Sequence, residues 1–332
     1  MSEKAERTVG ELSERDVLAR IFAVLAGSSQ ALVGPGDDAA VLAAPDGRVV
    51  VTTDTLVHGP DFRLAWSSGR DLGIKSAAVN LADIAAMGAR PTALFVALAV
   101  PDDTRIAFVE ELARGLREGC EQLAPGCAVE GGDLTVSDTL TIAVTAVGVL
   151  EHRAPVLRSG ARPGDVVAVA GTLGRAARGL ALLFDRFRDP AGEPVPVDAG
   201  ALSEQERDDL HAQLRPLPPV SLGPLAADAG ATALMDVSDG LVLDATRLAE
   251  ASGVTVALHG VGDGGVSDPH ELDGGEDHAL LGTFPASAAI PAGFRTIGVV
   301  EPRGAHPVTI DGRPYAGRGG WDPYQDWDAR RG

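Results

Sequence analysis

The sequence contains very little lysine, and arginine carries almost all of its positive charge. Lys4 and Lys75 are the only lysines among 28 basic residues, so a lysine-centred phosphate grip could use only Lys75. The formal net charge of −19 would repel nucleic acid and anionic lipid. Aromatic residues make up 4% of the chain, which argues against a stacking platform for single strands. We therefore expect neither a nucleic-acid-binding nor a membrane-binding protein.

Cysteines and long apolar runs are also scarce. Cys120 and Cys127 are the only cysteines, and no histidine lies near them in sequence, so we expect reduced, buried thiols rather than a zinc site. Apolar stretches such as 93–100 and 140–150 are too short to span a bilayer. The polar segment 1–16 lacks the apolar core of a signal peptide. These features predict a cytoplasmic protein.

Length and pattern indicate two domains. A chain of 332 residues with 45% hydrophobic residues exceeds what one core usually supports. The pattern of strands and helices restarts after residue 150 with a polar turn, Arg158–Asp165, that leads into an apolar stretch. We therefore predict domains at 1–152 and 153–332. Both halves mix the two kinds of element, so the expected fold class is α+β or α/β.

Apolar periodicity and capping residues predict individual elements. Helices are expected at 13–27, 68–87, 104–119 and 241–252, and strands at 49–53, 94–100, 140–149, 166–170 and 254–258. Because the first of these strands stops just before Asp54, we expect that carboxylate at a strand end.

Short acidic motifs recur through both halves of the chain. They are Gly36-Asp37-Asp38, Thr52-Thr53-Asp54, Asn80-Leu81-Ala82-Asp83, Gly131-Gly132-Asp133, Asp236-Val237-Ser238-Asp239-Gly240 and Gly274-Gly275-Glu276-Asp277. Carboxylates beside hydroxyls and glycines suit Mg²⁺ that carries phosphate groups. Each motif alone could equally be a turn or a helix cap. Together they predict one metal and nucleotide site assembled from distant segments.

Asp83 is the most informative of these residues, because the helix predicted around it is apolar on most sides. A buried carboxylate must be paired or bound to a metal, although Lys75 and Arg90 are near enough in sequence to make it structural. Arg158 could hold a phosphate oxygen or form an ordinary surface ion pair. Walker, protein-kinase and nucleophile-elbow motifs do not occur. The histidines form no metal-spaced pair, and His278 is expected to be a surface or packing residue.

Taken together, these motifs resemble the thiamine-monophosphate kinase family. The resemblance covers about residues 13–322 and includes Asn80–Ala89, Arg158–Ala161 and Gly320-Trp321-Asp322. It implies an aminoimidazole ribonucleotide synthetase-like fold, with an N-terminal domain whose sheet pairs with that of a second subunit, and a C-terminal α/β domain. It also implies a homodimer that phosphorylates thiamine monophosphate to thiamine diphosphate, with ATP as co-substrate and several Mg²⁺ ions.

The resemblance also assigns roles by position. The implied Mg²⁺ ligands are Asp37, Thr52, Thr53, Asp54, Asp83, Asp133, Asp236 and Asp239. The implied ATP contacts are Gly132, Asp133, Arg158 and Ser238, and the thiamine part would meet Asp61, Glu276 and Trp321.

This chain departs from the family pattern at three positions. Asp61 replaces a histidine, Ala113 replaces an aromatic residue, and His278 replaces a tyrosine. Two alternatives stay open: another ATP-using enzyme of the same fold, such as aminoimidazole ribonucleotide synthetase, or a catalytically silent nucleotide or thiamine-phosphate binding protein.

Overall fold

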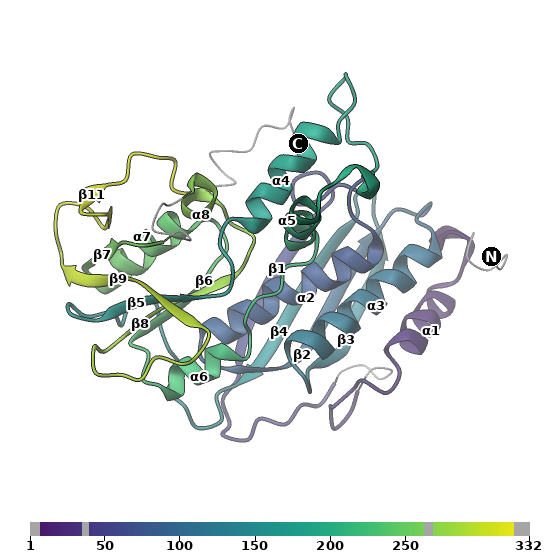
Figure 1. Ribbon diagram of the computed structural model, residues 1–332. Coiled ribbons are helices and arrows are strands. Elements are labelled where there is room, and N and C mark those ends of the chain that lie inside the picture. The colour runs from purple at the N-terminus through teal and green to yellow at the C-terminus, as the bar shows by residue number, and fades with distance from the viewer. Residues whose placement is uncertain (1–6, 35–39, 262–267, 322–332) are drawn as a thin grey trace.

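The computed structural model describes residues 7–34, 40–261 and 268–321, and its strands form two sheets (Figure 1). The N-terminal half contains α1 (Glu14–Leu25), β1 (Val50–Val57), α2 (Gly69–Ala86), β2 (Arg90–Val100), α3 (Ile106–Leu123), β3 (Ala128–Val136) and β4 (Thr141–Val149). The C-terminal half contains β5 (Val166–Ala170), α4 (Arg175–Arg186), α5 (Glu204–Leu214), α6 (Leu222–Asp228), β6 (Ala233–Val237), α7 (Leu241–Ser252), β7 (Val254–Leu258), α8 (Pro269–Asp273), β8 (Ala279–Phe284), β9 (Phe294–Pro302), β10 (Val308–Ile310) and β11 (Arg313–Pro314). The predicted two-domain α/β class is confirmed.

The first sheet has the strand order β1-β4-β2-β3, so β1 and β3 are its edges. β4 is antiparallel to both of its neighbours, and β3 runs parallel to β2. Side chains alternate between the faces of a strand, and Ile142, Val144 and Ala146 of β4 are buried beneath the helices. On the opposite face Val51 of β1 is 57% exposed, so this chain leaves that face open.

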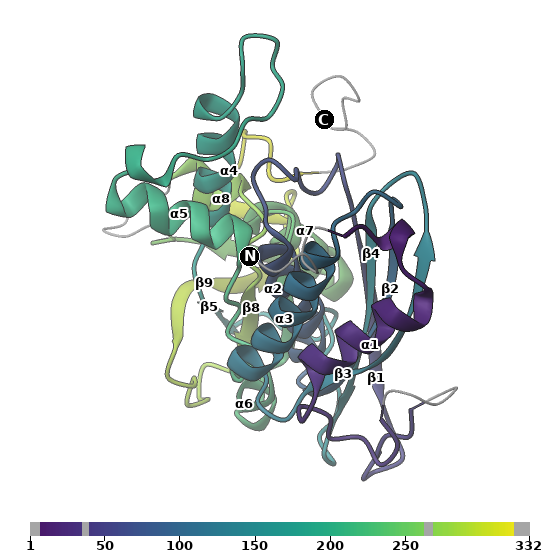
Figure 2. The same cartoon turned by 90° about the vertical axis from the view of Figure 1, so that its right-hand side faces the viewer.

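Helix α2 lies between the two sheets (Figure 2). It contacts β1 and β4 of the first sheet on one side and β6 and β8 of the second sheet on the other. Sixteen of its eighteen residues are buried, as expected for a helix that is apolar around most of its circumference. Ser68 begins the helix with a capping box to Asp71. The polar residues of α2 are therefore held inside the molecule, where both halves of the chain meet.

Glycines bring α2 and α3 into close contact. A Cβ atom on Gly73 would lie 2.2 Å from the carbonyl oxygen of Leu112, and one on Gly115 would lie 2.2 Å from that of Arg70. Gly69 and Gly119 extend the same contact by one turn on each helix. The helix pair is therefore fixed by backbone-to-backbone packing that no larger residue permits.

The second sheet has the order β11-β10-β7-β9-β5-β8-β6. Its central pairs are antiparallel, and only β7 with β10 is parallel among the strand pairs of this sheet in the described chain. Helix α7 packs against β6 and β7, while α4 and α5 pack on each other at one end of the molecule. A separate apolar cluster joins α4 and α5 to Trp66 in the loop between β1 and α2.

Three features of these elements differ from the sequence-based expectations or were not among them. β1 continues to Val57, so Asp54 lies within the strand rather than at its end. β3 continues through Gly131 and Gly132 because β2 pairs with it along its length. β8 is buried at every position and therefore shows no alternation that would reveal a strand.

The cysteines behave as the sequence predicts. Cys120 and Cys127 are free and buried. The neighbouring Cys127 thiol, together with burial, raises the pKa of Cys120, which favours the inert thiol form. Within the described ranges, no helix has the length and apolar character needed to cross a membrane.

Candidate active site

Carboxylates from three elements come together where α2 lies between the sheets. Asp54 belongs to β1, Asp83 to α2 and Asp236 to β6, and the charges of Asp54 and Asp236 both act on Asp83. Thr52 Oγ1 donates a hydrogen bond to Asp83 Oδ2 at 2.6 Å. The backbone N–H of Asp54 donates to Asn80 Oδ1 at 3.2 Å. The structure thus unites members of three predicted motifs, which we call the acid cluster (Asp54, Asp83 and Asp236).

Burial and neighbouring carboxylates disfavour the ionised forms of Asp83 and Asp54. Burial, followed by the charge of Asp236, raises the pKa of Asp83 to about 7. Burial also raises the pKa of Asp54, and the charges of Asp236 and Glu276 add to the effect. A carboxylate whose pKa is raised by burial and by neighbouring negative charge gains from a bound cation.

His278 is buried beside Asp236, so of the two expected positions, surface or packing, the structure excludes the surface one. It is 5% exposed, and its Nδ1 lies 3.1 Å from Asp236 Oδ2. Its Nε2 is buried and has no hydrogen-bond partner among the described residues. Burial alone would lower the pKa of His278, but the bond to Asp236 and the charge of Glu276 raise it overall. Its position directly after the Gly274–Asp277 motif was the available signal.

Lys75 and Glu276 form an ion pair beside the acid cluster. Lys75 also donates to the carbonyl oxygen of Gln213 at 3.3 Å. The backbone N–H of Glu276 donates to the carbonyl oxygen of Ser238 at 2.8 Å. Desolvation alone would raise the pKa of Glu276, but the charges of Lys75 and His278 lower it overall. Lys75, the one lysine considered for phosphate binding, is therefore fixed in place by Glu276, which was predicted to contact the substrate.

A pocket of about 700 Å³, called the main pocket below, opens next to this ion pair. Five predicted site residues line it, namely Asp61, Ser238, Asp239, Glu276 and Trp321. The backbone N–H of Val57 donates to Asp61 Oδ2 at 2.7 Å. The backbone N–H of Trp321 donates to the carbonyl oxygen of Asp239 at 2.9 Å, which ties the C-terminal segment to the pocket. Polar groups from both halves of the chain thus surround one cavity.

Asp239 is engaged by an arginine. Arg247 Nη1 lies 2.6 Å from Asp239 Oδ2 and 2.7 Å from an oxygen of the fully buried Asp244. Asp244 also accepts hydrogen bonds from the backbone N–H groups of Asp239 and Gly240, and burial raises its pKa to about 6. Gly240, at φ 138°, is the N-cap of α7, so the capping role considered for Ser238 and Asp239 falls to the glycine.

Asp133 and Gly132 lie apart from the acid cluster. Across the four strands of the sheet, Asp133 pairs with Ala97, Ala97 with Ala143, and Ala143 with Thr55. The side chain of Asp133 therefore lies on the same face as that of Thr55, opposite to the face of Asp54. Both predicted residues line a second pocket of about 730 Å³ between α1, α3 and β3, which also contains Ala113. Thr53 points to the same open face, and its hydroxyl donates to the carbonyl oxygen of Val144 at 3.0 Å.

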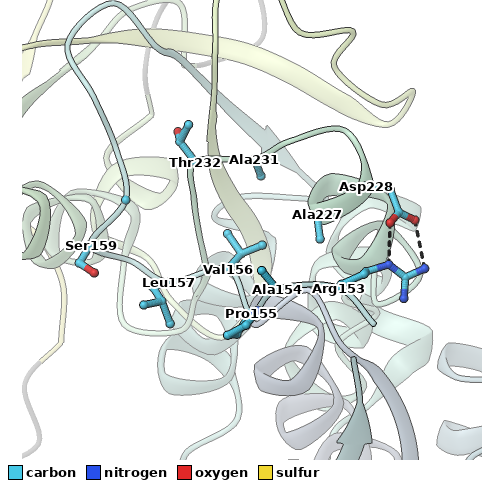
Figure 3. Close-up of a pocket in the computed structure, with 11 residues that line it drawn as sticks. Arg153, Ala154, Pro155, Val156, Leu157, Ser159, Ala227, Asp228, Ala231 and Thr232 are labelled. Atoms are coloured by element: carbon cyan, nitrogen blue, oxygen red, sulfur yellow. Dashed lines mark hydrogen bonds and ion pairs between the residues drawn. The ribbon is translucent and has the colours of Figure 1, made fainter. Parts of the chain in front are cut away.

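Of two further predicted residues, the structure places only Arg158, and it lies away from the acid cluster. Arg158 is exposed, and its carbonyl oxygen accepts from Ser252 at the C-terminal end of α7, whereas Asp239 lies at the opposite end. Asp37 lies outside the described residues. A third hollow, of about 560 Å³, contains the Arg153–Asp228 ion pair and none of the predicted site residues (Figure 3).

The donor set fits Mg²⁺, although it is not closed around one point. In residues 7–34, 40–261 and 268–321, no three carboxylate, imidazole or thiol groups converge as the ligands of one ion. Mg²⁺ usually keeps waters or phosphate oxygens in its shell and needs only one or two carboxylates from the protein. Burial and the charges of Asp236 and Asp54 raise the pKa of Asp83 more than Thr52 and His278 lower it, so a bound cation would favour its ionised form.

Comparison with known proteins identifies the family of this chain. A family model described as "AIR synthase related protein, N-terminal domain" matches residues 36–150. Thiamine-monophosphate kinase of Mycobacterium tuberculosis (strain CDC 1551 / Oshkosh) is 40% identical over 335 residues, which cover 97% of this chain and 94% of that protein. The crystal structure of thiamine-monophosphate kinase from Stenotrophomonas maltophilia K279a has a TM-score of 0.74 at 31% identity, covering 91% of this chain and 98% of the other. AaThiL, complexed with AMPPCP and TMP, has a TM-score of 0.70 at 31% identity, covering 93% and 96%. This chain therefore belongs to the thiamine-monophosphate kinase family.

Proposed function

We propose that this protein transfers the terminal phosphoryl group of ATP to the phosphate of thiamine monophosphate, giving thiamine diphosphate and ADP. The observation that carries the proposal is the acid cluster, drawn from both halves of the chain, beside a main pocket that contains Lys75 and Glu276. Support for the substrate comes from relatives named thiamine-monophosphate kinase and from the AaThiL complex with AMPPCP and TMP.

This reaction requires charge neutralisation rather than a general base. The acceptor phosphate is already ionised at neutral pH, so the main obstacle is repulsion between two anionic phosphates. Mg²⁺, when bound, supplies positive charge between them. The chain's part is to hold that charge through carboxylates, to fix Lys75 with Glu276, and to align both phosphates for direct in-line transfer. The proposed Mg²⁺ ligands remain Asp37, Thr52, Thr53, Asp54, Asp83, Asp133, Asp236 and Asp239.

The remaining site assignments are also proposals. Positions in the main pocket support thiamine contacts by Asp61, Glu276 and Trp321. For ATP, the candidates remain Gly132, Asp133, Ser238 and Arg158, of which the exposed Arg158 has the weakest geometric support.

We also propose that the enzyme is a cytoplasmic homodimer. β1 and β3 are edge strands, and Val51 and Val136 leave large apolar side chains exposed on the first sheet, at 57% and 63%. Unpaired sheet edges and exposed apolar side chains favour association with a second copy. The small, charged reactants suit a cytoplasmic biosynthetic enzyme.

The test is to incubate the pure protein with ATP, Mg²⁺ and thiamine monophosphate and to measure thiamine diphosphate and ADP. We expect the two products in equal amounts and none after Mg²⁺ is chelated. Turnover of formylglycinamidine ribonucleotide without thiamine diphosphate would instead assign the chain to aminoimidazole ribonucleotide synthetase activity. Binding of both ligands without any turnover would make it a silent binding protein.

A further inference from the structure

Arg63, in the loop between β1 and α2, lines the main pocket, and its guanidinium lies over the ring of Trp66. Its Nη2 is buried and makes no hydrogen bond within the described residues. Its Nη1 makes only a long bond of 3.4 Å to the carbonyl oxygen of the neighbouring Phe62. No carboxylate of the described chain forms an ion pair with it. A buried guanidinium donor without a partner is costly, and an acceptor on a ligand would offset that cost.

Two nearly perpendicular aromatic rings, those of Trp66 and Phe184, form a wall beside Arg63. Its guanidinium carbon lies 5.8 Å from the ring centroid of Trp66, and Trp66 packs edge-on against Phe184 at 5.2 Å and 75°. The indole N–H of Trp66 donates to the carbonyl oxygen of Phe187 at 3.1 Å, which fixes the ring. Trp66 and Phe184 both line the main pocket, where a planar ring of a ligand can pack.

The same wall carries an acceptor two residues from Arg63. Asp61 lines the main pocket, and its Oδ2 already accepts from the backbone N–H of Val57. Its second carboxylate oxygen makes no hydrogen bond within the described residues. The charges of Asp61 and Arg63 act on each other, which places the two groups close together. This wall therefore offers one free acceptor beside one free donor.

We propose that Arg63 and Asp61 together recognise the 4-aminopyrimidine ring of the substrate, which is an inference that rests on the proposed function. The exocyclic amino group donates to Asp61, and the adjacent ring nitrogen accepts from Arg63. The phosphate must reach the acid cluster, to which Glu276 is electrostatically coupled, so the pyrimidine is left for the aromatic end of the main pocket. Arg63 is thus a specificity-determining residue, and Asp61 gains a defined partner.

The test compares three ligands on wild type and Arg63→Met by calorimetry, with Mg²⁺ and without ATP. The ligands are thiamine monophosphate, its analogue with a 4-oxo group in place of the amino group, and thiazole monophosphate, which lacks the pyrimidine. Because the 4-oxo edge reverses donor and acceptor, wild type should bind that analogue at least tenfold more weakly than the substrate. Arg63→Met should weaken substrate binding roughly tenfold or more and should reduce the ratio between the affinities for the substrate and for the 4-oxo analogue. Its affinity for thiazole monophosphate should equal that of wild type.

A stability measurement separates this role from a structural one. The guanidinium carbon of Arg188 lies 5.4 Å from the ring centroid of Phe184. Burial lowers the pKa of Arg63 most, and the positive charge of Arg188 lowers it further. Removing Arg63 relieves that repulsion, so Arg63→Met should unfold at the same or a higher temperature while gaining less from added substrate. The matched control is Arg186→Met. Arg186 lies on α4, like Phe184, and its ion pair is with Glu206 at the surface, so this variant should bind the substrate as wild type does.

Three results would overturn the inference. Substrate affinity equal to that of wild type in Arg63→Met would show that Arg63 makes no contact. In a second contrary result, Arg63→Met and Arg188→Gln would each lose as much affinity for thiazole monophosphate as for thiamine monophosphate, and inorganic phosphate would compete with both ligands. The two arginines would then bind an anion and not the pyrimidine. If wild type makes no thiamine diphosphate, the proposed function is wrong as well. If wild type turns over normally and the binding results contradict the inference, only the role given to Arg63 is wrong.

Discussion

Asp83 carries a pH-dependent stability cost when no cation is present. Its folded-state pKa is raised to about 7 by burial and by Asp236, so between about pH 4 and 7 the folded chain retains a proton that the unfolded chain releases. The free energy of unfolding therefore falls as pH rises through this range. We expect Asp83→Asn to exceed wild type in stability at pH 8 by on the order of 2 kcal/mol, and to match it at pH 4.

Thermal unfolding across this pH range, with and without Mg²⁺, checks the Asp83 prediction. Added Mg²⁺ should stabilise wild type at pH 8 and should stabilise Asp83→Asn much less. An Asp83→Asn variant that is less stable than wild type at pH 8 without Mg²⁺ would mean that the carboxylate is compensated by the protein itself.

His278 combines a buried hydrogen bond with an unusual backbone conformation. Its φ is 52°, a region that asparagine tolerates and β-branched residues avoid. His278→Val should lose about 2–3 kcal/mol of stability, because Asp236 loses its partner and the backbone is strained. His278→Asn keeps a donor and should lose less than half as much. Urea unfolding at pH 7 measures both, and equal losses would contradict this account.

The sequence could single out the three carboxylates that form the acid cluster, but not their hydrogen-bond partners. Asp54, Asp83 and Asp236 belong to short motifs that mark oxygen ligands. The contact between His278 and Asp236 joins residues 42 positions apart, so no local pattern reveals it. Thr53 was predicted beside Thr52, but strand alternation sends its side chain to the other face.

At the scale of elements, the contact between α2 and α3 depends on the absence of side chains. Alanine favours helix over glycine by about 1 kcal/mol, so a free helix would gain from Gly73→Ala. In this protein the new Cβ would lie 2.2 Å from the carbonyl oxygen of Leu112. We therefore expect Gly73→Ala to lose about 2 kcal/mol or more, measured by urea unfolding. Arg114→Ala, at an exposed position of α3, is the matched control and should change stability by less than about 0.5 kcal/mol.

Elements with a clear periodicity or cap were predictable, and those fixed by pairing were not. The capping residue Ser68 and the almost wholly apolar stretch that follows it are enough to indicate α2. The extent of β1 is different, because Asp54 is a poor signal for a strand and its pairing with β4 holds it there. The position of Asp54 within β1 therefore could not be predicted from its local sequence.

At the scale of the whole molecule, one chain does not unite all the proposed ligands. Asp54 and Asp133 lie on strands at opposite edges of the first sheet, with side chains on opposite faces. Three strand spacings separate the two edges by roughly 14 Å, whereas Mg²⁺ binds oxygen at about 2.1 Å. If both residues serve one reaction, Asp133 must come from a second copy whose β3 lies near β1.

This requirement predicts complementation between two inactive variants. Asp54→Asn and Asp133→Asn should each lose most thiamine monophosphate phosphorylation as separate homodimers. When the two variants are unfolded and refolded together, a mixed dimer contains one damaged site and one site with both carboxylates intact. Random pairing should therefore restore about a quarter of wild-type activity, with dimers confirmed by sedimentation. If Asp133 instead acted with Asp54 of its own chain, both sites of every mixed dimer would be damaged and no activity would return. Full activity of Asp133→Asn alone would remove that residue from the machinery and, with it, this argument for a shared site.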